Sequence, residues 1–396
     1  MIRHLFTLMW NRKRANALLT LEIVLAFVVL FAVGSVGVFY WTNYRAPLGF
    51  AYENAWQINL SPGTQPHAEQ FGTLQQVLAR LRSTPGVVAV SRSQDNTPFA
   101  FTNNTAALDY GEGTAKRSAG DVNIYSAGPE LRDVMGVQLK EGRWFDRRDE
   151  VTNLVPIVID EHLREQLFEP EQAAVGQVVR GGDERWRIVG VSGPYRADGE
   201  LSEPKPSFFR YVGPQDTTRA LFKLLVRVRP GAGAVLEKQI GDDIRAINPL
   251  WHSSIDYLTE MRIAQLKVRL TPPAILSVVC IFLIINVALG LFGVLWLNIN
   301  QRRAELGVRR ALGATGAAIS GQVLGEILVL TTFGLVLGLL VAAQFPLLSV
   351  FNVKAGVYLA GMALATVGLY ALAAGCALYP SRLAAGIQPA VALREE

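Results

Sequence analysis

Four long apolar runs limit what this chain can fold into. The first, residues 18–41, carries one charge, and three runs in the last third carry a single charge between them. An α-helix needs about 20 apolar residues to cross the core of a bilayer, and each run is long enough. Only 18% of the residues are charged, so a purely soluble protein is disfavoured. We place membrane spans at residues 15–42, 271–299, 317–344 and 356–379.

A cleavable signal peptide is the alternative for the first run. Arg12, Lys13 and Arg14 make a basic flank, and Ala32-Val33-Gly34 offers small residues for cleavage. The apolar part of a signal peptide is about 7–15 residues long, and this run is longer. A span is therefore the favoured interpretation.

Basic residues in the short flanks set the orientation of the spans. They lie ahead of the first span, after the second and in the tail: Arg3, Arg12, Lys13, Arg14, Arg302, Arg303, Arg309, Arg310, Arg382 and Arg394. The loop at residues 345–355 holds only Lys354. Because positive residues stay inside, we predict an inner-membrane protein with both termini cytoplasmic. Residues 1–14 then form an interfacial helix, 300–316 a cytoplasmic loop and 380–396 a cytoplasmic tail, while 43–270 and 345–355 are periplasmic.

The periplasmic segment has the pattern of a mixed α/β domain. Apolar residues recur with helical period at residues 74–81 and 163–168, and Gly181-Gly182-Asp183 is a plausible hairpin turn. From Trp251 to Leu270 an amphipathic helix is predicted to lead to the second span, interrupted only by Pro272-Pro273. Strands are predicted at residues 86–91, 154–159, 176–180, 185–191 and 222–228.

The sequence lacks the usual signatures of catalysis. None of the 4 histidines belongs to a His-Glu-x-x-His pair, and Cys280 and Cys376 both lie in spans, so no catalytic residue and no metal site are predicted. Asp160-Glu161-His162 is interpreted as an acidic helix cap. A membrane-anchored enzyme is thereby disfavoured. The net charge of +5 comes from the membrane flanks, so nucleic acid is not an expected partner.

No Gly-x-x-x-x-Gly-Lys-Ser/Thr loop occurs in the chain. We therefore expect no cofactor on this chain, and any energy source would have to come from another polypeptide.

The cytoplasmic loop predicts a short amphipathic helix. Arg302, Glu305 and Arg309 are spaced for ion pairs on one face, whereas Val308 and Leu312 mark an apolar face. Such a helix can bind a groove on another protein. The alternative is a positive anchor without a partner.

This loop carries a family resemblance. Residues 302–314 read R-R-A-E-L-G-V-R-R-A-L-G-A, which resembles the permease subunits of the MacB, LolC/LolE and FtsX group of ABC transporters. The similarity continues through residues 321–326, 334, 338 and 380–393. In the periplasmic segment, residues 141–145 and 187–191 are similar to the MacB-type domain, which has a porter part and an inserted sabre part.

The resemblance implies mechanotransmission in a MacB-type exporter. Two permeases, identical or homologous, each dock a cytoplasmic helix on one of two ABC ATPase subunits, and ATP-driven motion reaches the periplasmic domains and expels a substrate. MacB carries its own ATPase, whereas this sequence begins at the first span, so a separate ATPase is expected. The sequence does not decide whether a periplasmic adaptor protein and an outer-membrane channel are further partners. The implied docking residues are Arg302, Arg303, Glu305, Leu306, Gly307, Val308, Arg309, Arg310, Ala311, Leu312 and Gly313.

Two related functions remain as alternatives, an FtsX-like signalling scaffold that recruits periplasmic partners and a lipoprotein-release permease of LolC/LolE type.

The third span carries five residues with expected packing roles. Gly321/Gly325 and Gly334/Gly338 are two Gly-x-x-x-Gly pairs that allow close helix approach, either within the chain or with another chain. Glu326 is costly in a membrane unless it faces protein or water, and we favour a structural hydrogen-bonding role over a proton relay.

Overall fold

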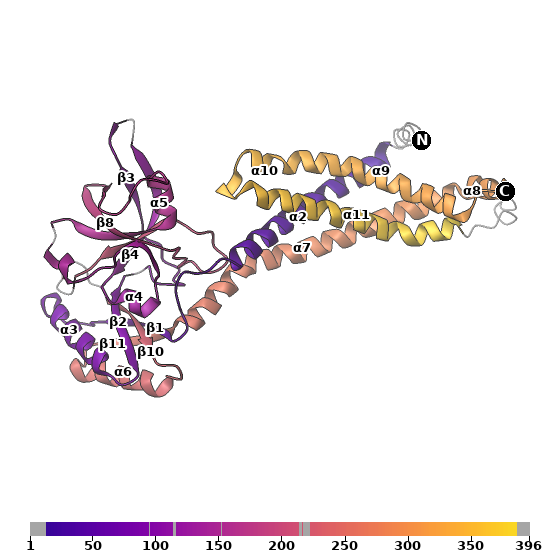
Figure 1. Cartoon of the computed structure of the whole chain (residues 1–396). Coiled ribbons are helices and arrows are strands. Elements are labelled where there is room, and N and C mark those ends of the chain that lie inside the picture. The colour runs from indigo at the N-terminus through magenta and orange to yellow at the C-terminus, as the bar shows by residue number, and fades with distance from the viewer. Residues whose placement is uncertain are drawn as a thin grey trace. The chain divides into compact units, whose positions relative to one another are not determined.

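The computed structural model describes residues 13–94, 96–113, 116–151, 153–213, 216 and 222–385. They form two compact units, shown in Figure 1. The membrane unit contains the chain up to Thr42 and from Leu270 onward, and the outer unit is Asn43–Arg269. The predicted fold class, four long apolar helices with a mixed α/β domain between the first two, is confirmed.

Among the described residues, four helices are long and apolar enough to cross a bilayer. They are α2 (Lys13–Tyr44), α7 (Leu258–Gln301), α9 (Gly316–Ala342) and α11 (Ala355–Ala385). Helix α8 (Arg303–Ala311) joins α7 to α9, and α10 (Gln344–Leu347) with the 3₁₀ turn η3 (Val350–Asn352) joins α9 to α11. Residues 1–12 of the predicted interfacial helix and 386–396 of the tail lie outside the described residues.

Close glycine contacts hold α9 and α11 against α2. A Cβ atom at Gly334 would lie 2.5 Å from Ile23 Cγ2, and one at Gly338 would lie 2.5 Å from Phe27 Cδ1. At Gly361 of α11, a Cβ would approach the backbone nitrogen of Ser35 to 3.0 Å. The Gly334/Gly338 pair therefore serves packing within the chain. Around Gly321 and Gly325 the described residues leave open space.

We expect Gly338→Leu to disrupt the helix bundle, whereas Gly325→Leu on the same helix is tolerated by the isolated chain. The leucine at 338 overlaps Phe27, including its Cβ, and overpacking of this kind costs about 1–3 kcal/mol. Thermal unfolding of the two purified variants in detergent measures the difference. Equal unfolding temperatures would contradict the packing described here.

The outer unit begins and ends in a four-stranded antiparallel sheet. Its order is β11 (His252–Tyr257), β1 (Ala55–Ser61), β10 (Lys223–Val228) and β2 (Val87–Ser93). Helices α3 (His67–Ser83) and α6 (Ala234–Ile247) bury apolar side chains against this sheet, in a core that also contains Trp56 and Trp251. Because the first and last strands are neighbours, both ends of the unit meet in this sheet.

A second sheet is inserted between β2 and β10. Its strands pair in a closed circle, β8–β6–β9–β4–β3–β7–β8, and β5 adds to the free part of β8. This nesting agrees with the prediction of one part inserted into another. The strands are β3 (Thr105–Tyr110), β4 (Arg117–Ala127), β5 (Leu139–Gly142), β6 (Val155–Asp160), β7 (Val178–Gly181), β8 (Glu184–Ser192) and β9 (Ser207–Tyr211), with helices α4 (Leu131–Met135), η2 (Arg147–Val151) and α5 (Glu161–Leu167) between them.

Several local predictions are confirmed. Helices α3 and α5 form where helical period was found, and the hairpin between β7 and β8 turns at Gly182, whose φ is +61°. Asp160 caps α5, because its Oδ1 accepts a hydrogen bond from the backbone nitrogen of Leu163 at 2.8 Å. Asp160-Glu161-His162 is therefore a helix start, as interpreted.

The helix predicted from Trp251 to Leu270 is wrong in its first part. Residues from His252 to Tyr257 form strand β11, which pairs with β1, and the helix begins at Leu258. The predicted interruption at Pro272-Pro273 is also wrong, because α7 continues through both prolines. Each proline lacks a backbone donor and crowds the carbonyl group four residues before it, but its φ suits a helix, and here the pair does not end α7.

Candidate docking site at helix α8

The turns on either side of α8 fix the position of this helix. Arg302, with φ of −110°, interrupts the helical backbone after α7. Gly313 has a φ of +96°, a conformation that favours glycine, and reverses the chain after α8. The hydroxyl of Thr315 accepts a hydrogen bond from the backbone nitrogen of Ala318 at 3.2 Å and caps α9. The short helix is thus held between two defined turns.

Five side chains form a closed ring of hydrogen bonds and ion pairs between α8 and α9. We call Arg302, Glu305, Arg309, Gln322 and Glu326 the charged ring. Arg302 donates to Glu326 at 3.0 and 3.2 Å and to Glu305 at 3.1 Å. Arg309 donates to Glu305 at 2.6 Å and to Gln322 at 2.7 Å. Gln322 closes the circle by donating to Glu326 at 3.2 Å.

The charged ring gives Glu326 partners inside the apolar helix α9. The side chains of Arg302 and Glu326 are 21% and 26% exposed, so their ion pair is partly shielded from water. Charged groups in such surroundings depend on their partners more than surface pairs do. Glu326 accepts hydrogen bonds from Arg302 and Gln322, and the choice of a structural role over a proton relay stays a prediction. The charged ring also fastens α8 to α9.

The apolar residues of the loop divide between two faces. Leu306 is 6% exposed and packs in the core of the membrane unit, and Gly307 is buried beside it. Val308 is 42% exposed and Leu312 is 83% exposed. Of the predicted docking residues, Leu306 and Gly307 therefore face the chain's own bundle. The residues that face outward are Arg303, Val308, Ala311, Leu312 and Gly313.

Two predicted residues lie between these faces. Arg310 is half-buried on α8, as is Arg309 of the charged ring, while Glu305 is exposed. Among the described residues, no group of three or more His, Cys, Asp or Glu side chains is placed to hold a metal ion. Helix α8, with Val308 and Leu312 exposed, is therefore a candidate for protein contact.

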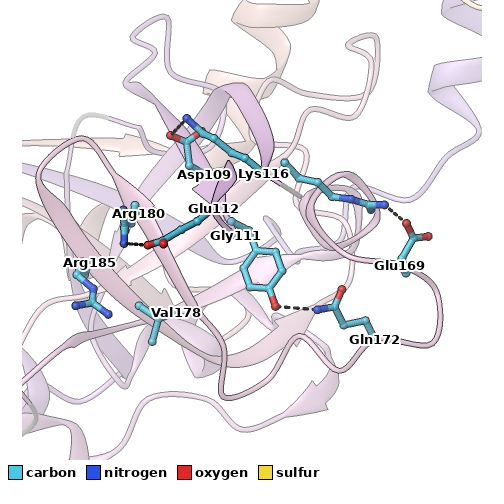
Figure 2. A pocket seen from close by; sticks show the side chains of 11 residues that line it. Asp109, Gly111, Glu112, Lys116, Glu169, Gln172, Val178, Arg180 and Arg185 are labelled. Carbon is cyan, nitrogen blue, oxygen red and sulfur yellow. Dashed lines mark hydrogen bonds and ion pairs between the residues drawn. The ribbon is translucent and has the colours of Figure 1, made fainter. Parts of the chain in front are cut away.

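The outer unit has a polar hollow of about 790 Å³, which is the other candidate site. Figure 2 shows Lys116 beside Asp109 and Arg180 beside Glu112. Lys116 lies 2.9 Å from Asp109, Arg180 lies 2.5 Å from Glu112, and Arg117 pairs with Glu169. These three pairs use all three acidic residues of the lining, and Arg185 adds a further positive charge to it. The sequence did not indicate this hollow.

The hydroxyl group of Tyr110 in this hollow is also partnered. It accepts a hydrogen bond from Gln172 Nε2 at 2.8 Å and donates one to Gln177 Oε1 at 3.3 Å. Two glutamine side chains therefore hold the Tyr110 hydroxyl group in place.

Solved structures of outer domains are similar to this chain. The periplasmic region of MacB from Actinobacillus actinomycetemcomitans aligns over 54% of this chain and 92% of its own, with 16% identity and a TM-score of 0.38. The extracellular domain of the noncanonic ABC-type transporter YknZ from Gram-positive bacteria aligns over 50% and 99%, with 16% identity and a TM-score of 0.34.

Curated relatives are similar in sequence over more of the chain. The macrolide export ATP-binding/permease protein MacB of Hahella chejuensis is 27% identical, over 70% of this chain and 43% of the relative. The protein of the same name from Agrobacterium fabrum is 24% identical, over 86% of this chain and 52% of the relative. This chain thus spans about half the length of the relatives it matches, or less.

Two family models together cover most of the chain. The MacB-like periplasmic core domain matches residues 17–243, and the FtsX-like permease C-terminal region matches residues 277–389. The first match alone covers more than half of the 396 residues. The chain therefore belongs to the MacB/FtsX family of ABC transporter permeases, multi-pass membrane proteins with a periplasmic-type domain.

Proposed function

We propose that this chain is the permease subunit of a MacB-type exporter, in which α8 docks on an ABC ATPase and passes its motion to the outer unit. The observation that carries the proposal is the construction of α8. Its outward face presents Val308 and Leu312, while the charged ring fastens it to α9. An exposed apolar face can bind another protein, and because α8 is fixed to α9, movement of the bound protein can be transmitted to the membrane helices.

The energy source is proposed to lie outside these 396 residues. The chain has no phosphate-binding loop, whereas its relatives are described as ATP-binding/permease proteins. We therefore assign ATP and Mg²⁺ to two partner ATPase subunits and propose that a second permease, identical or homologous, completes the complex. In this arrangement the catalytic step belongs to the ATPase.

The proposed topology places both termini and α8 in the cytoplasm of a cell with an inner membrane, and the outer unit in the periplasm. The support for this topology is the clustering of arginines around α8 and in the two end segments. The ATPase is then on the side where ATP is available.

The interior of the membrane unit supports mechanical coupling rather than passage of substrate through the bundle. Phe27, Phe31, Leu291 and Leu369 are at most 2% exposed and belong to one continuous apolar core. A polar substrate crossing this core would have to displace close-packed side chains. Export is therefore proposed to result from movement of the outer units on their own side of the membrane.

Site-specific photo-crosslinking tests the docking proposal. A photo-activatable amino acid replaces Leu312 before α9, and a matched variant carries it at Leu347 after α9. The two leucines are 83% and 80% exposed. We expect the variant at position 312 to capture an ABC ATPase in cells and the variant at 347 to capture none. Failure to capture an ATPase at 312, in protein that is correctly inserted, would refute docking at α8.

A further inference from the structure

A single loop of the outer unit touches both segments that continue into membrane helices. The loop comprises residues 195–202, between β8 and β9, and we call it the joint loop. It starts in the core of the outer unit, where the Tyr195 ring lies 4.9 Å from Phe50, 4.8 Å from Tyr125 and 4.9 Å from Phe209, between ring centroids. One end of the loop is therefore anchored among strands of the inserted sheet.

Arg196 fastens the first of the two segments. Its side chain is buried, with 3% of the residue exposed, and Nη1 donates to the backbone oxygens of Asn43 at 2.9 Å and Ala46 at 2.8 Å. Nη2 donates to the backbone oxygens of Glu200 at 2.7 Å and Ser202 at 2.6 Å. One guanidinium thus ties the end of α2 and the residues just after it to the far end of the joint loop.

The backbone of the joint loop strengthens this tie. The amide nitrogen of Arg196 donates to the carbonyl oxygen of Leu48 at 2.9 Å, and the Asn43 side chain donates to the carbonyl oxygen of Leu201 at 3.5 Å. Burial lowers the pKa of the Arg196 guanidinium, and the carbonyl oxygens around it compensate for the lost water. The segment from residue 43 to 48 is consequently held by the loop at several points.

Glu200 fastens the second segment. Its carboxylate is 8% exposed and pairs with Arg262 in the first turns of α7. The guanidinium of Arg262 also lies over the ring of Tyr52, 4.9 Å from its centroid. An ion pair this sheltered, stacked on an aromatic ring, holds α7 in a defined position against the loop.

Gly199 lets α7 approach the joint loop closely. Its φ is +84°, and a Cβ there would lie 2.6 Å from Oε1 of Gln265. Gln265 is 3% exposed, so the contact is buried. Along the loop, Tyr195 therefore packs in the core, Arg196 binds residues 43–46, and Gly199 and Glu200 contact α7.

We propose that the joint loop couples the two segments, so that a displacement at the start of α7 reaches residues 43–48 through Glu200 and Arg196. The functional meaning of this inference rests on the proposed function, because coupling of the two segments would make the outer unit move as a whole when the ATPase moves α7. Arg196, Glu200 and Arg262 are positioning residues in this scheme. The coupling itself is a property of the free protein and can be tested without an ATPase.

Hydrogen–deuterium exchange of the full chain in detergent tests the coupling. Arg262→Gln removes the ion pair at the α7 end, and the readout is exchange at residues 43–48. Arg262 also interacts electrostatically with Tyr44, so residues 45–48 decide the comparison. We expect exchange there to rise on the order of fivefold, together with exchange at residues 196–202. Arg262→Lys keeps the charge and is expected to stay near wild type.

Arg80→Gln provides the matched control. It removes another ion pair of the outer unit, with Asp243 at 2.9 Å between α3 and α6, and is expected to leave exchange at residues 43–48 unchanged. If Arg262→Gln raises exchange only within α7, the joint loop does not couple the segments and the proposal is overturned. If Arg262→Gln also raises exchange in strands β6 and β9, the substitution has loosened the whole outer unit, and Glu200→Gln is used in its place. A rise at residues 43–48 with Glu200→Gln then supports the coupling, and a rise confined to α7 overturns it.

A second measurement separates this proposal from the proposed function. In a complex with the ATPase, Arg262→Gln is expected to keep the crosslink at position 312 and to lose the nucleotide-dependent change in exchange of the outer unit. Loss of the crosslink in wild-type protein would refute docking and leave the exchange experiment on free protein unaffected. If Arg262→Gln keeps the full nucleotide-dependent change in exchange of the outer unit, the coupling proposed for the joint loop is overturned.

Discussion

Leu312→Asp is expected to abolish stimulation of the partner ATPase while the protein still folds and inserts. The side chain is 83% exposed in the isolated chain, so the substitution costs little stability there. In the proposed complex the same position is buried, and a carboxylate in an apolar contact combines lost packing with an unpaired charge. Together these effects weaken binding by about 3 kcal/mol or more, which is at least about 100-fold.

The measurement is ATPase activity of the reconstituted complex together with the amount of ATPase that co-purifies. Leu347→Asp is the matched control, because Leu347 is equally exposed and lies beyond the other end of α9. Leu306→Asp behaves differently, since Leu306 is 6% exposed, and we expect it to fail at folding. Normal stimulation with Leu312→Asp would show that α8 does not dock through this face.

Glu326→Ala is expected to separate docking from coupling. The substitution opens the charged ring and leaves Arg302 and Gln322 without their shared acceptor. Loss of one partner from a partly buried ion pair costs about 1–3 kcal/mol, so α8 becomes loosely attached to α9. The outward face of α8 is unchanged. We therefore expect the ATPase to bind within about twofold of wild type, while coupled stimulation falls about tenfold.

Glu326→Gln is the conservative variant for this prediction. The amide oxygen still accepts a hydrogen bond from Arg302 without the charge, so an intermediate loss of coupling is expected. Activity is measured against ATPase concentration, which distinguishes weaker binding from weaker coupling. If Glu326→Ala binds and couples normally, the ring is not part of force transfer. If binding is lost together with coupling, the ring acts in docking itself.

The membrane helices were predictable because the bilayer leaves few choices. A span has to be apolar over most of its length, and runs with a single charge such as Glu22 can be recognised from composition alone. The same holds for α3, whose buried residues Leu74, Val77 and Leu81 recur with helical period. In these helices the spacing of apolar residues in the sequence agrees with the surroundings in which the helix lies in the fold.

Strand β11 was mistaken for helix because its apolar residues fit two periods. Ile255 and Leu258 are three apart, as on a helix, but Ile255 and Tyr257 are two apart, as on a strand. Pairing with β1 decides between them, and that partner lies about 200 residues away in the chain. Strand β4 was missed for a related reason. It contains Gly120 and Asp121, whose φ is +54°, and long-range pairing with β3 and β9 holds it extended.

The charged ring could be foreseen only in part. The spacing of Arg302, Glu305 and Arg309 indicated ion pairs on α8, but it did not show that Gln322 and Glu326 would complete the circle from α9. Nor did spacing distinguish the two faces of α8, because Leu306 and Leu312 are both leucines in an amphipathic pattern. The joint loop had no signal of its own, since Arg196 acts through backbone oxygens that any residue could supply.

The nesting of the two sheets has a consequence for how members of this family can diversify. Ser93 at the end of β2 is paired with Lys223 at the start of β10, so the inserted segment leaves and rejoins the four-stranded sheet at adjacent points. An insert with neighbouring ends can be exchanged like a cassette, because its replacement does not alter the register of the strands that carry it. Evolution could thus fit different inserted sheets to the same four-stranded sheet, provided that each insert brings its own version of residues 195–202.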